Sequence, residues 1–174
     1  ATIALNDDAS LIGVSAEYFY YININHSFKI VYVYKLDTVN KTVTPMSSVS
    51  DIEISNPAIY GADKFIITNM GETTNSYIYS ETGIDWQTGN FTHNIFPTSV
   101  IYANNQFIVF DYLAGQVLVS TDGINWNIEK MDFTADYEAP CSSNALIVAF
   151  AMAPNEGKAA YRTNELFKVG QKTY

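Results

Sequence analysis

A ten-residue segment occurs twice in this chain of 174 residues, and the repetition restricts the fold more than any other feature of the sequence. Tyr77–Trp86 and Val117–Trp126 align without gaps at a shift of 40 residues. They share a serine, a glycine, an isoleucine and a tryptophan, and their two tryptophans are the only ones in the chain. Because repetition at a period of about 20–50 residues is typical of stacked supersecondary units, we expect a repeat architecture.

Weaker copies extend the repeat over the rest of the chain. Tyr60–Thr68 resembles Tyr102–Phe110, upstream of the two matching segments. A further copy begins at Ser142–Phe150 and ends at Phe167, which takes the place of the tryptophan, and the first copy is the most divergent. We therefore predict a single repeat domain whose approximate units are 1–49, 50–93, 94–134 and 135–174.

Within a unit, short β-rich runs separated by turn residues predict four antiparallel strands. In the second and third units these runs are Ile52–Tyr60, Lys64–Thr68, Ser76–Ser80, Asp85–Thr88, Thr98–Ala103, Gln106–Asp111, Gln116–Ser120 and Asn125–Glu129. Four strands in about 40 residues are typical of a propeller blade. The expected fold is all-β, either a closed four-bladed propeller or an open arc of four propeller-like blades, each a four-stranded antiparallel sheet. Exposed sheet edges pair readily, so the open arc predicts oligomerisation or incorporation into an assembly.

The segment Ser120-Thr-Asp-Gly-Ile-Asn-Trp126 resembles the Asp-box, the bacterial neuraminidase repeat of sialidase-like β-propellers. Asp122 and Gly123 are adjacent here, as in the shortened form found in propeller-like bacterial and phage proteins. The other copy departs further from the pattern, because Thr82 stands in the aspartate position. The resemblance implies propeller blades and covers about residues 50–170 as a repeat.

We expect the repeated motif to be a folding device between the third and fourth strands. An aspartate can accept hydrogen bonds from turn amides, a glycine can adopt positive φ, and a tryptophan can bury a large ring between blades. The residues assigned this structural role are Ser80, Gly83, Trp86, Ser120, Asp122, Gly123 and Trp126.

The residue types argue against enzymatic chemistry. A sialidase needs an arginine triad, and Arg162 is the only arginine. No pair of carboxylates stands at a spacing that singles out a glycosidase, and His26 and His93 lack the neighbours of a metal site. Asp132, Asp136 and Glu138 could hold Ca²⁺, but a solvated loop is the favoured interpretation, and the single Cys141 is interpreted as a small buried residue. We expect no catalytic residue, cofactor or metal.

Charge limits the partners. The chain holds 9 Lys and Arg against 18 Asp and Glu, a formal charge of −9, which disfavours phosphate contacts with nucleic acid and anionic membranes. The longest apolar runs, such as Ala145–Met152, are too short for membrane insertion. The N-terminal residues lack a signal-peptide pattern, so we expect a complete polypeptide made in the cytoplasm, although a trimmed chain is an alternative.

Tyrosines are concentrated in the first unit, at Tyr18, Tyr20, Tyr32 and Tyr34. Because strand side chains alternate between faces, one set has to point away from the inner packing. The favoured interpretation is packing between blades. A protein contact surface comes second and glycan binding third.

The leading functional hypothesis is a non-enzymatic structural or adhesion module that contacts other proteins or a host surface. Its sharpest version is a phage virion component, in a tail fibre, a tail tip or a head decoration, assembled with other virion proteins or as a homo-oligomer. The alternative is a carbohydrate-recognition module of a bacterial surface or secreted protein, and a glycoside hydrolase is less favoured.

Overall fold

The computed structural model consists of four separate four-stranded antiparallel sheets, without helices among the described residues. It describes residues 9–13, 18–25, 30–50, 58–68, 76–111, 116–130, 137–142, 147–151, 158–162 and 168–171. Side chains are described at 20, 22, 30–48, 58–68, 76–111 and 116–130. Within these residues no helix could span a membrane.

Each sheet is built from four consecutive strands in sequence order, and we call these sheets blades 1 to 4. Blade 1 contains β1 (Ala9–Gly13), β2 (Tyr18–Asn25), β3 (Ile30–Asp37) and β4 (Thr42–Ser50). Blade 2 contains β5 (Ile59–Gly61), β6 (Lys64–Thr68), β7 (Ser76–Ser80) and β8 (Gln87–Asn90). Blade 3 contains β9 (Pro97–Ala103), β10 (Gln106–Asp111), β11 (Gln116–Ser120) and β12 (Asn127–Lys130). Blade 4 contains β13 (Tyr137–Ser142), β14 (Ile147–Ala151), β15 (Lys158–Arg162) and β16 (Lys168–Gln171).

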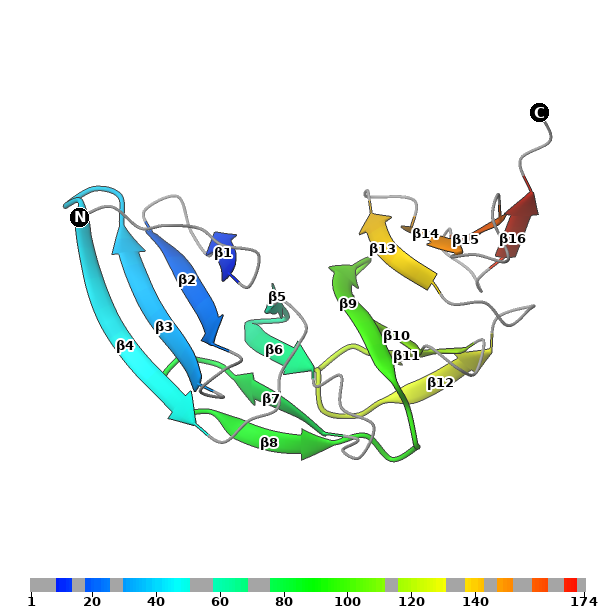
Figure 1. Ribbon diagram of the computed structural model, residues 1–174, viewed down its shortest axis with the longest axis horizontal. Helices are drawn as coiled ribbons and strands as arrows, with labels where there is room; N and C mark the ends of the chain where they lie inside the picture. The colour runs from blue at the N-terminus through cyan, green and yellow to red at the C-terminus, as the bar shows by residue number, and fades with distance from the viewer. Residues whose placement is uncertain are drawn as a thin grey trace.

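The predicted all-β fold of four-stranded units is confirmed, and of the two predicted arrangements the structure adopts the open arc. The first strands of successive blades lie beside one another, β1 against β5, β5 against β9 and β9 against β13. Figure 1 shows the four sheets fanning out from these strands without closing into a ring, with blade 1 at one end and blade 4 at the other.

The middle strands of blades 2 and 3 have the predicted bounds, whereas the outer strands differ. β8 begins at Gln87 and β12 at Asn127, two residues later than expected in each case. In both blades the tryptophan belongs to the preceding turn, where its ring packs toward the neighbouring blade, and pairing begins after it.

Packing between blades explains the burial of these strands. Every residue of β6 is buried, and so is every residue of β10 after Gln106, because these strands have a sheet on each face. β3 is different. Val31 and Val33 are 1 % exposed against blade 2, while Tyr32 and Tyr34 on the opposite face are half-buried. The alternation marks blade 1 as a terminal sheet with one covered face.

Two apolar clusters connect the blades. In the first, Val31 and Val33 of blade 1 pack with Phe65 and Ile67 of blade 2. In the second, residues of blade 2 meet blade 3, and its members are Ile66, Tyr77, Phe91, Ile95, Phe107, Val109, Leu118 and Trp126. Alternate residues of β6 therefore enter different clusters, as strand geometry requires.

The hairpins between the first two strands of blades 2 and 3 have the same two-residue turn. Ala62 and Asp63 have φ of 44° and 55°, and Asn104 and Asn105 have φ of 52° and 59°. Positive φ at both positions is the type I′ geometry that suits the twist of a β-hairpin. Asparagine tolerates this region well, whereas alanine there is strained.

We expect Ala62→Asn to raise the free energy of unfolding by about 0.5–1 kcal/mol, because it relieves strain at a left-handed position. Urea denaturation with a constant m-value would measure the gain. The reciprocal change Asn104→Ala is expected to lower stability by a similar amount. Unchanged stability in both variants would contradict the strain assigned to this turn.

Candidate functional site

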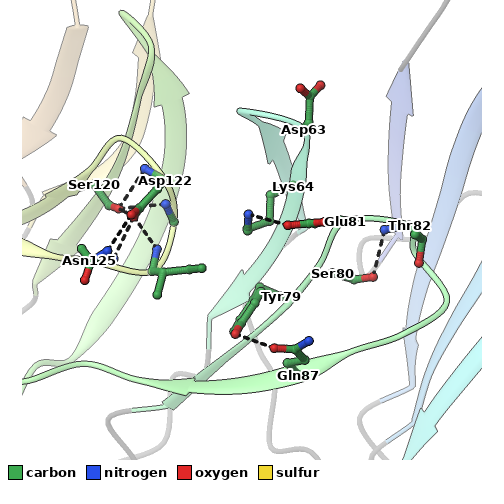
Figure 2. A network of polar contacts seen from close by, with 12 residues as sticks. Asp63, Lys64, Tyr79, Ser80, Glu81, Thr82, Gln87, Ser120, Asp122 and Asn125 are labelled. Carbon is green, nitrogen blue, oxygen red and sulfur yellow. Dashed lines mark hydrogen bonds and ion pairs between the residues drawn. The ribbon is translucent and has the colours of Figure 1, made fainter.

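The two copies of the repeated motif lie at the turns between the third and fourth strands of their blades, β7–β8 and β11–β12. In blade 3 the Ser120 hydroxyl accepts hydrogen bonds from the backbone amides of Asp122 (3.3 Å) and Gly123 (2.8 Å). The Asp122 carboxylate accepts from the backbone amides of Ile124 and Asn125, both at 2.8 Å. The Asn125 side chain adds a bond of 2.7 Å, and Figure 2 shows this network.

The hydrogen bonds control the charge of Asp122. Partial burial raises the pKa of its carboxyl group, but the amides of Asn125 and Ile124, the Asn125 side chain and the Ser120 hydroxyl outweigh burial. The pKa of Asp122 is therefore held well below the ordinary aspartate range. This carboxylate is ionised and engaged in the turn, which makes it a structural group.

The turn of blade 2 keeps the same arrangement without the carboxylate. Ser80 Oγ accepts from the Thr82 and Gly83 amides at 3.3 and 2.9 Å. Thr82 Oγ1 replaces the aspartate and accepts from the amides of Ile84 (3.1 Å) and Asp85 (3.3 Å). A hydroxyl can fill the aspartate position because the turn needs an acceptor there, and the longer distances indicate weaker bonds.

A third example lies in blade 1, in the turn between β3 and β4, which the Asp-box resemblance did not identify. Asp37 Oδ1 accepts from the amides of Val39 (2.9 Å) and Asn40 (2.8 Å), and Asn40 donates from its side chain at 2.9 Å. The hydrogen bond from the Asn40 amide is the main cause that lowers the pKa of Asp37. The order Asp-x-Val-Asn matches Asp-Gly-Ile-Asn at Asp122, which is the signal that could have identified this turn.

The turn glycines place each turn against the preceding blade. Gly83 and Gly123 have φ of 75° and 72°. A Cβ at Gly123 would lie 2.6 Å from Ile66 Cδ1 in blade 2, and one at Gly83 would lie 3.3 Å from Tyr20 Cε1 in blade 1. A hydroxyl of the preceding blade also reaches each turn, since Ser47 donates to the Gly83 carbonyl at 2.7 Å and Tyr77 to the Ile124 carbonyl at 3.4 Å.

The two tryptophans lie at these junctions. Trp86 Nε1 donates to the Gly83 carbonyl at 3.2 Å, and its ring packs on the cluster between blades 1 and 2. Trp126 is 8 % exposed and meets Tyr77 and Phe91 edge-on at 5.6 and 5.1 Å. In blades 2 and 3 the glycine and the tryptophan of the repeat motif thus pack the turn against the preceding blade.

The predicted tyrosine surface is divided between two faces. Tyr20 packs edge-on against Phe65 at 4.9 Å and belongs to the junction between blades 1 and 2. Tyr32 and Tyr34 lie on the opposite face of blade 1. Tyr18 begins β2 opposite Asp37, and its side chain lies outside the described residues.

A groove of about 310 Å³ lies where blade 2 meets the turn of blade 3, and sequence reasoning missed it. Its lining residues are Tyr79, Ser80, Glu81, Thr82, Asp85, Gln87 and Ile124. The Tyr79 hydroxyl donates to Gln87 Oε1 at 2.7 Å, and Lys64 Nζ lies 3.3 Å from Glu81 Oε1, as Figure 2 shows. Lys64 itself is only 7 % exposed, so its ammonium needs this partner.

The chemistry expected at other residues is partly beyond the described part of the chain. The residues considered for Ca²⁺ are outside it, Asp132 and Asp136 entirely and Glu138 for its side chain, as are His26 and the side chains of Cys141 and Arg162. His93 lies on an exposed turn beside Thr92, 2.8 Å from its hydroxyl. Over the described residues, no group of three or more His, Cys, Asp or Glu could hold a metal.

Solved structures with the same fold place the chain in the β-propeller class. A catalytically inactive virginiamycin B lyase from Staphylococcus aureus with quinupristin superimposes with a TM-score of 0.69 at 8 % identity, covering 97 % of this chain and 58 % of that one. YCF48 bound to a D1 peptide gives 0.64 at 13 % identity, covering 99 % and 56 %. A streptogramin B lyase gives 0.65 at 12 % identity, covering 97 % and 57 %.

The chain therefore spans a little over half the length of these structural neighbours. No protein-family model matches the sequence, and no curated protein does. At these identities the likeness establishes the propeller fold. The resemblance to the Asp-box rests on the turn residues of this sequence alone.

We expect Asp122→Thr to lower the free energy of unfolding by about 1 kcal/mol at pH 7, because a neutral acceptor replaces a charged one at the same turn amides. The folded-state pKa of Asp122 is depressed, so its contribution is present above the unfolded pKa of about 3.9 and is lost as pH falls below it. Urea titrations from pH 7 to pH 2.5 would test this. A stability difference that persisted undiminished at pH 2.5 would contradict the assigned role of the carboxylate.

We expect Gly123→Ala to destabilise the protein more than Gly83→Ala. Both replacements place alanine at positive φ, at a cost of about 1–2 kcal/mol, but only the first drives Cβ into a buried side chain, Ile66. Thermal and urea unfolding of the two variants, side by side, would separate strain from overlap. Equal losses of stability in the two variants would show that the Ile66 side chain can move aside without losing packing energy.

Proposed function

We propose that this chain is a non-enzymatic interaction module that works within a larger assembly. The observation that carries the proposal is the outer face of blade 1. This face bears Tyr32, Tyr34 and Leu36 on β3 and, across from Leu36, Val43 on β4, which is 38 % exposed. In the interior blades the corresponding faces are covered by another sheet, and here the sheet is the end of the arc (Figure 1).

Aromatic side chains with a polar tip suit a protein contact, since they supply apolar area and remain compatible with water. We propose a second copy of the chain, or another protein of the same assembly, as the partner of this face. Four blades occupy 56–58 % of the neighbours' length, so the rest of those chains amounts to about three units of this size. A comparable addition would continue the arc of this protein.

The setting that we propose is a phage particle, in a tail fibre, tail tip or head decoration. Its support is the resemblance of the shortened turns to those of phage and bacterial propeller proteins, together with the low fraction of charged residues (16 %) and the Asn-, Thr- and Tyr-rich strands. A bacterial surface or secreted glycan-binding module is the alternative. The lyase activity named for two structural neighbours is a property of those proteins. We propose that this chain has no enzymatic activity.

Light scattering after size-exclusion chromatography tests the proposal. We expect a mass at least twice that of the 19.4 kDa chain, and a monomer when Tyr32→Ser and Tyr34→Ser are combined, because the change removes the aromatic area of the end face.

Val39→Ser is the matched control. Val39 is 68 % exposed on a turn of the same blade but does not belong to the sheet face, so this variant is expected to keep the wild-type mass. A wild-type protein that remains a monomer at high concentration, alone and with candidate assembly proteins, would overturn the proposal.

A further inference from the structure

We propose that the groove between blades 2 and 3 binds a lysine or arginine side chain of an extended partner polypeptide, with an aliphatic neighbour of that residue on Ile124. The inference builds on the proposed function, because it names the chemistry of a partner. It concerns a different surface from the end face of blade 1. The test of the groove and the test of the end face can therefore give opposite results.

The charge of the groove favours a cation. Among its lining residues, Glu81 is paired with Lys64, which sits beside the turn of blade 3. Asp85 is exposed and forms no ion pair with the described residues, so the three groups together leave one negative charge. A chain with a formal charge of −9 adds a long-range attraction for basic partners. A neutral sugar would make no use of this excess.

The wall of the groove suits the same ligand. The Tyr79 hydroxyl is bound to Gln87 at 2.7 Å, and the Tyr79 ring lies 5.9 Å from that of Tyr77. The aromatic surface is thus held in place before a ligand arrives. A lysine or arginine head within about 6 Å of a tyrosine ring gains a cation–π attraction. A volume of about 310 Å³ accommodates one long side chain.

The differences between the two motif copies are concentrated at the groove. The shared residues Ser80, Gly83 and Trp86 build the turn or the blade junction. Five residues line the groove and differ from their counterparts: Tyr79, Glu81, Thr82, Asp85 and Gln87, which correspond to Val119, Thr121, Asp122, Asn125 and Asn127. Blade 3 has Val119, Thr121 and Asn125 at the equivalent positions, so the fold does not need the aromatic ring of Tyr79 or the carboxylates of Glu81 and Asp85. Their presence in blade 2 therefore points to recognition.

An exposed aliphatic residue occupies the same position in three of the motif turns. Val39, Ile84 and Ile124 hold the same place in the turns of blades 1, 2 and 3 and are 68 %, 46 % and 46 % exposed. Only Ile124 of the three lines the groove. An aliphatic side chain flanking the basic residue of a bound peptide can cover it, and the two contacts together fit an extended segment of alternating basic and aliphatic residues.

The test uses the full chain and fluorescein-labelled peptides measured by fluorescence anisotropy. The probes are Gly-Ser-Leu-Arg-Leu-Ser-Gly, its lysine analogue, and the same peptide with neutral citrulline in place of arginine. We expect the citrulline peptide to bind about tenfold more weakly than the arginine peptide, and the binding of the arginine peptide to weaken with added salt.

Matched variants locate the site. Asp85→Asn installs the residue found at the equivalent Asn125, so the turn is expected to fold, and it should weaken the arginine peptide about tenfold while leaving the citrulline peptide unchanged. Ile124→Ser should weaken both peptides severalfold. Ile84→Ser, at the same turn position and the same exposure but outside the groove, should weaken neither.

Three results would overturn the inference: no saturable binding of either basic peptide, equal affinity for the arginine and citrulline peptides, or equal effects of Ile84→Ser and Ile124→Ser. Binding of a neutral oligosaccharide that is lost in Tyr79→Leu, in place of peptide binding, would assign the groove to glycans. Peptide binding by a protein that stays monomeric, alone and with candidate assembly proteins, would support the groove and reject the proposed assembly. A protein that assembles but binds neither basic peptide would support the proposed function and reject the groove as a peptide site.

Discussion

Face-to-face packing of the sheets is the constraint on which the rest of the structure depends. A four-stranded sheet of about 40 residues cannot bury two apolar faces by itself, so each blade has to lie between two others to be fully covered. Phe107, Ile108, Val109 and Phe110 are all 0 % exposed, although successive residues point to opposite faces. The continuous burial of β10 is thus a property of the stack. On β3, by contrast, Val31 and Val33 face blade 2 and are buried, whereas Tyr32 and Tyr34 on the opposite face are half-buried.

The motif turns give the stack its fixed geometry. A backbone at positive φ brings Gly123 against Ile66, and a side-chain acceptor at Asp122 holds the turn in that shape. Thr82 and Asp37 provide the same acceptor in the other turns, in one case with a different residue type. The physical requirement is an acceptor in the turn and, in blades 2 and 3, a glycine against the neighbouring blade. The Asp-box resemblance identified two of these turns because it describes that requirement, and it missed the one without a glycine.

The sequence was sufficient for the all-β fold of four-stranded units and for the middle strands of blades 2 and 3. The period of 40 residues, the β-rich runs and the turn residues are local signals, so the middle strands Lys64–Thr68 and Gln106–Asp111 were placed to the residue. It was not sufficient for the open arc, because the angle between blades depends on how rings such as Trp126 and Phe91 fit together. The groove was also out of reach, since Tyr79 and Ile124 meet only after blades 2 and 3 have packed.

The contacts that hold blades 2 and 3 together also determine the shape of the groove. Two kinds of residue can therefore be distinguished here: those that position the groove and those that line it. Tyr77 reaches the Ile124 carbonyl from blade 2, and Gly123 sets the approach of the turn that carries Ile124. These residues determine how far Ile124 lies from Tyr79 without lining the groove themselves. A change at Gly123 therefore alters stability and the shape of the groove together, whereas a change at Asp85 alters the charge of the groove in a turn whose fold tolerates asparagine. Asp85 and Asn125 show that a residue of the second sort can differ between blades while the turn around it keeps its hydrogen bonds.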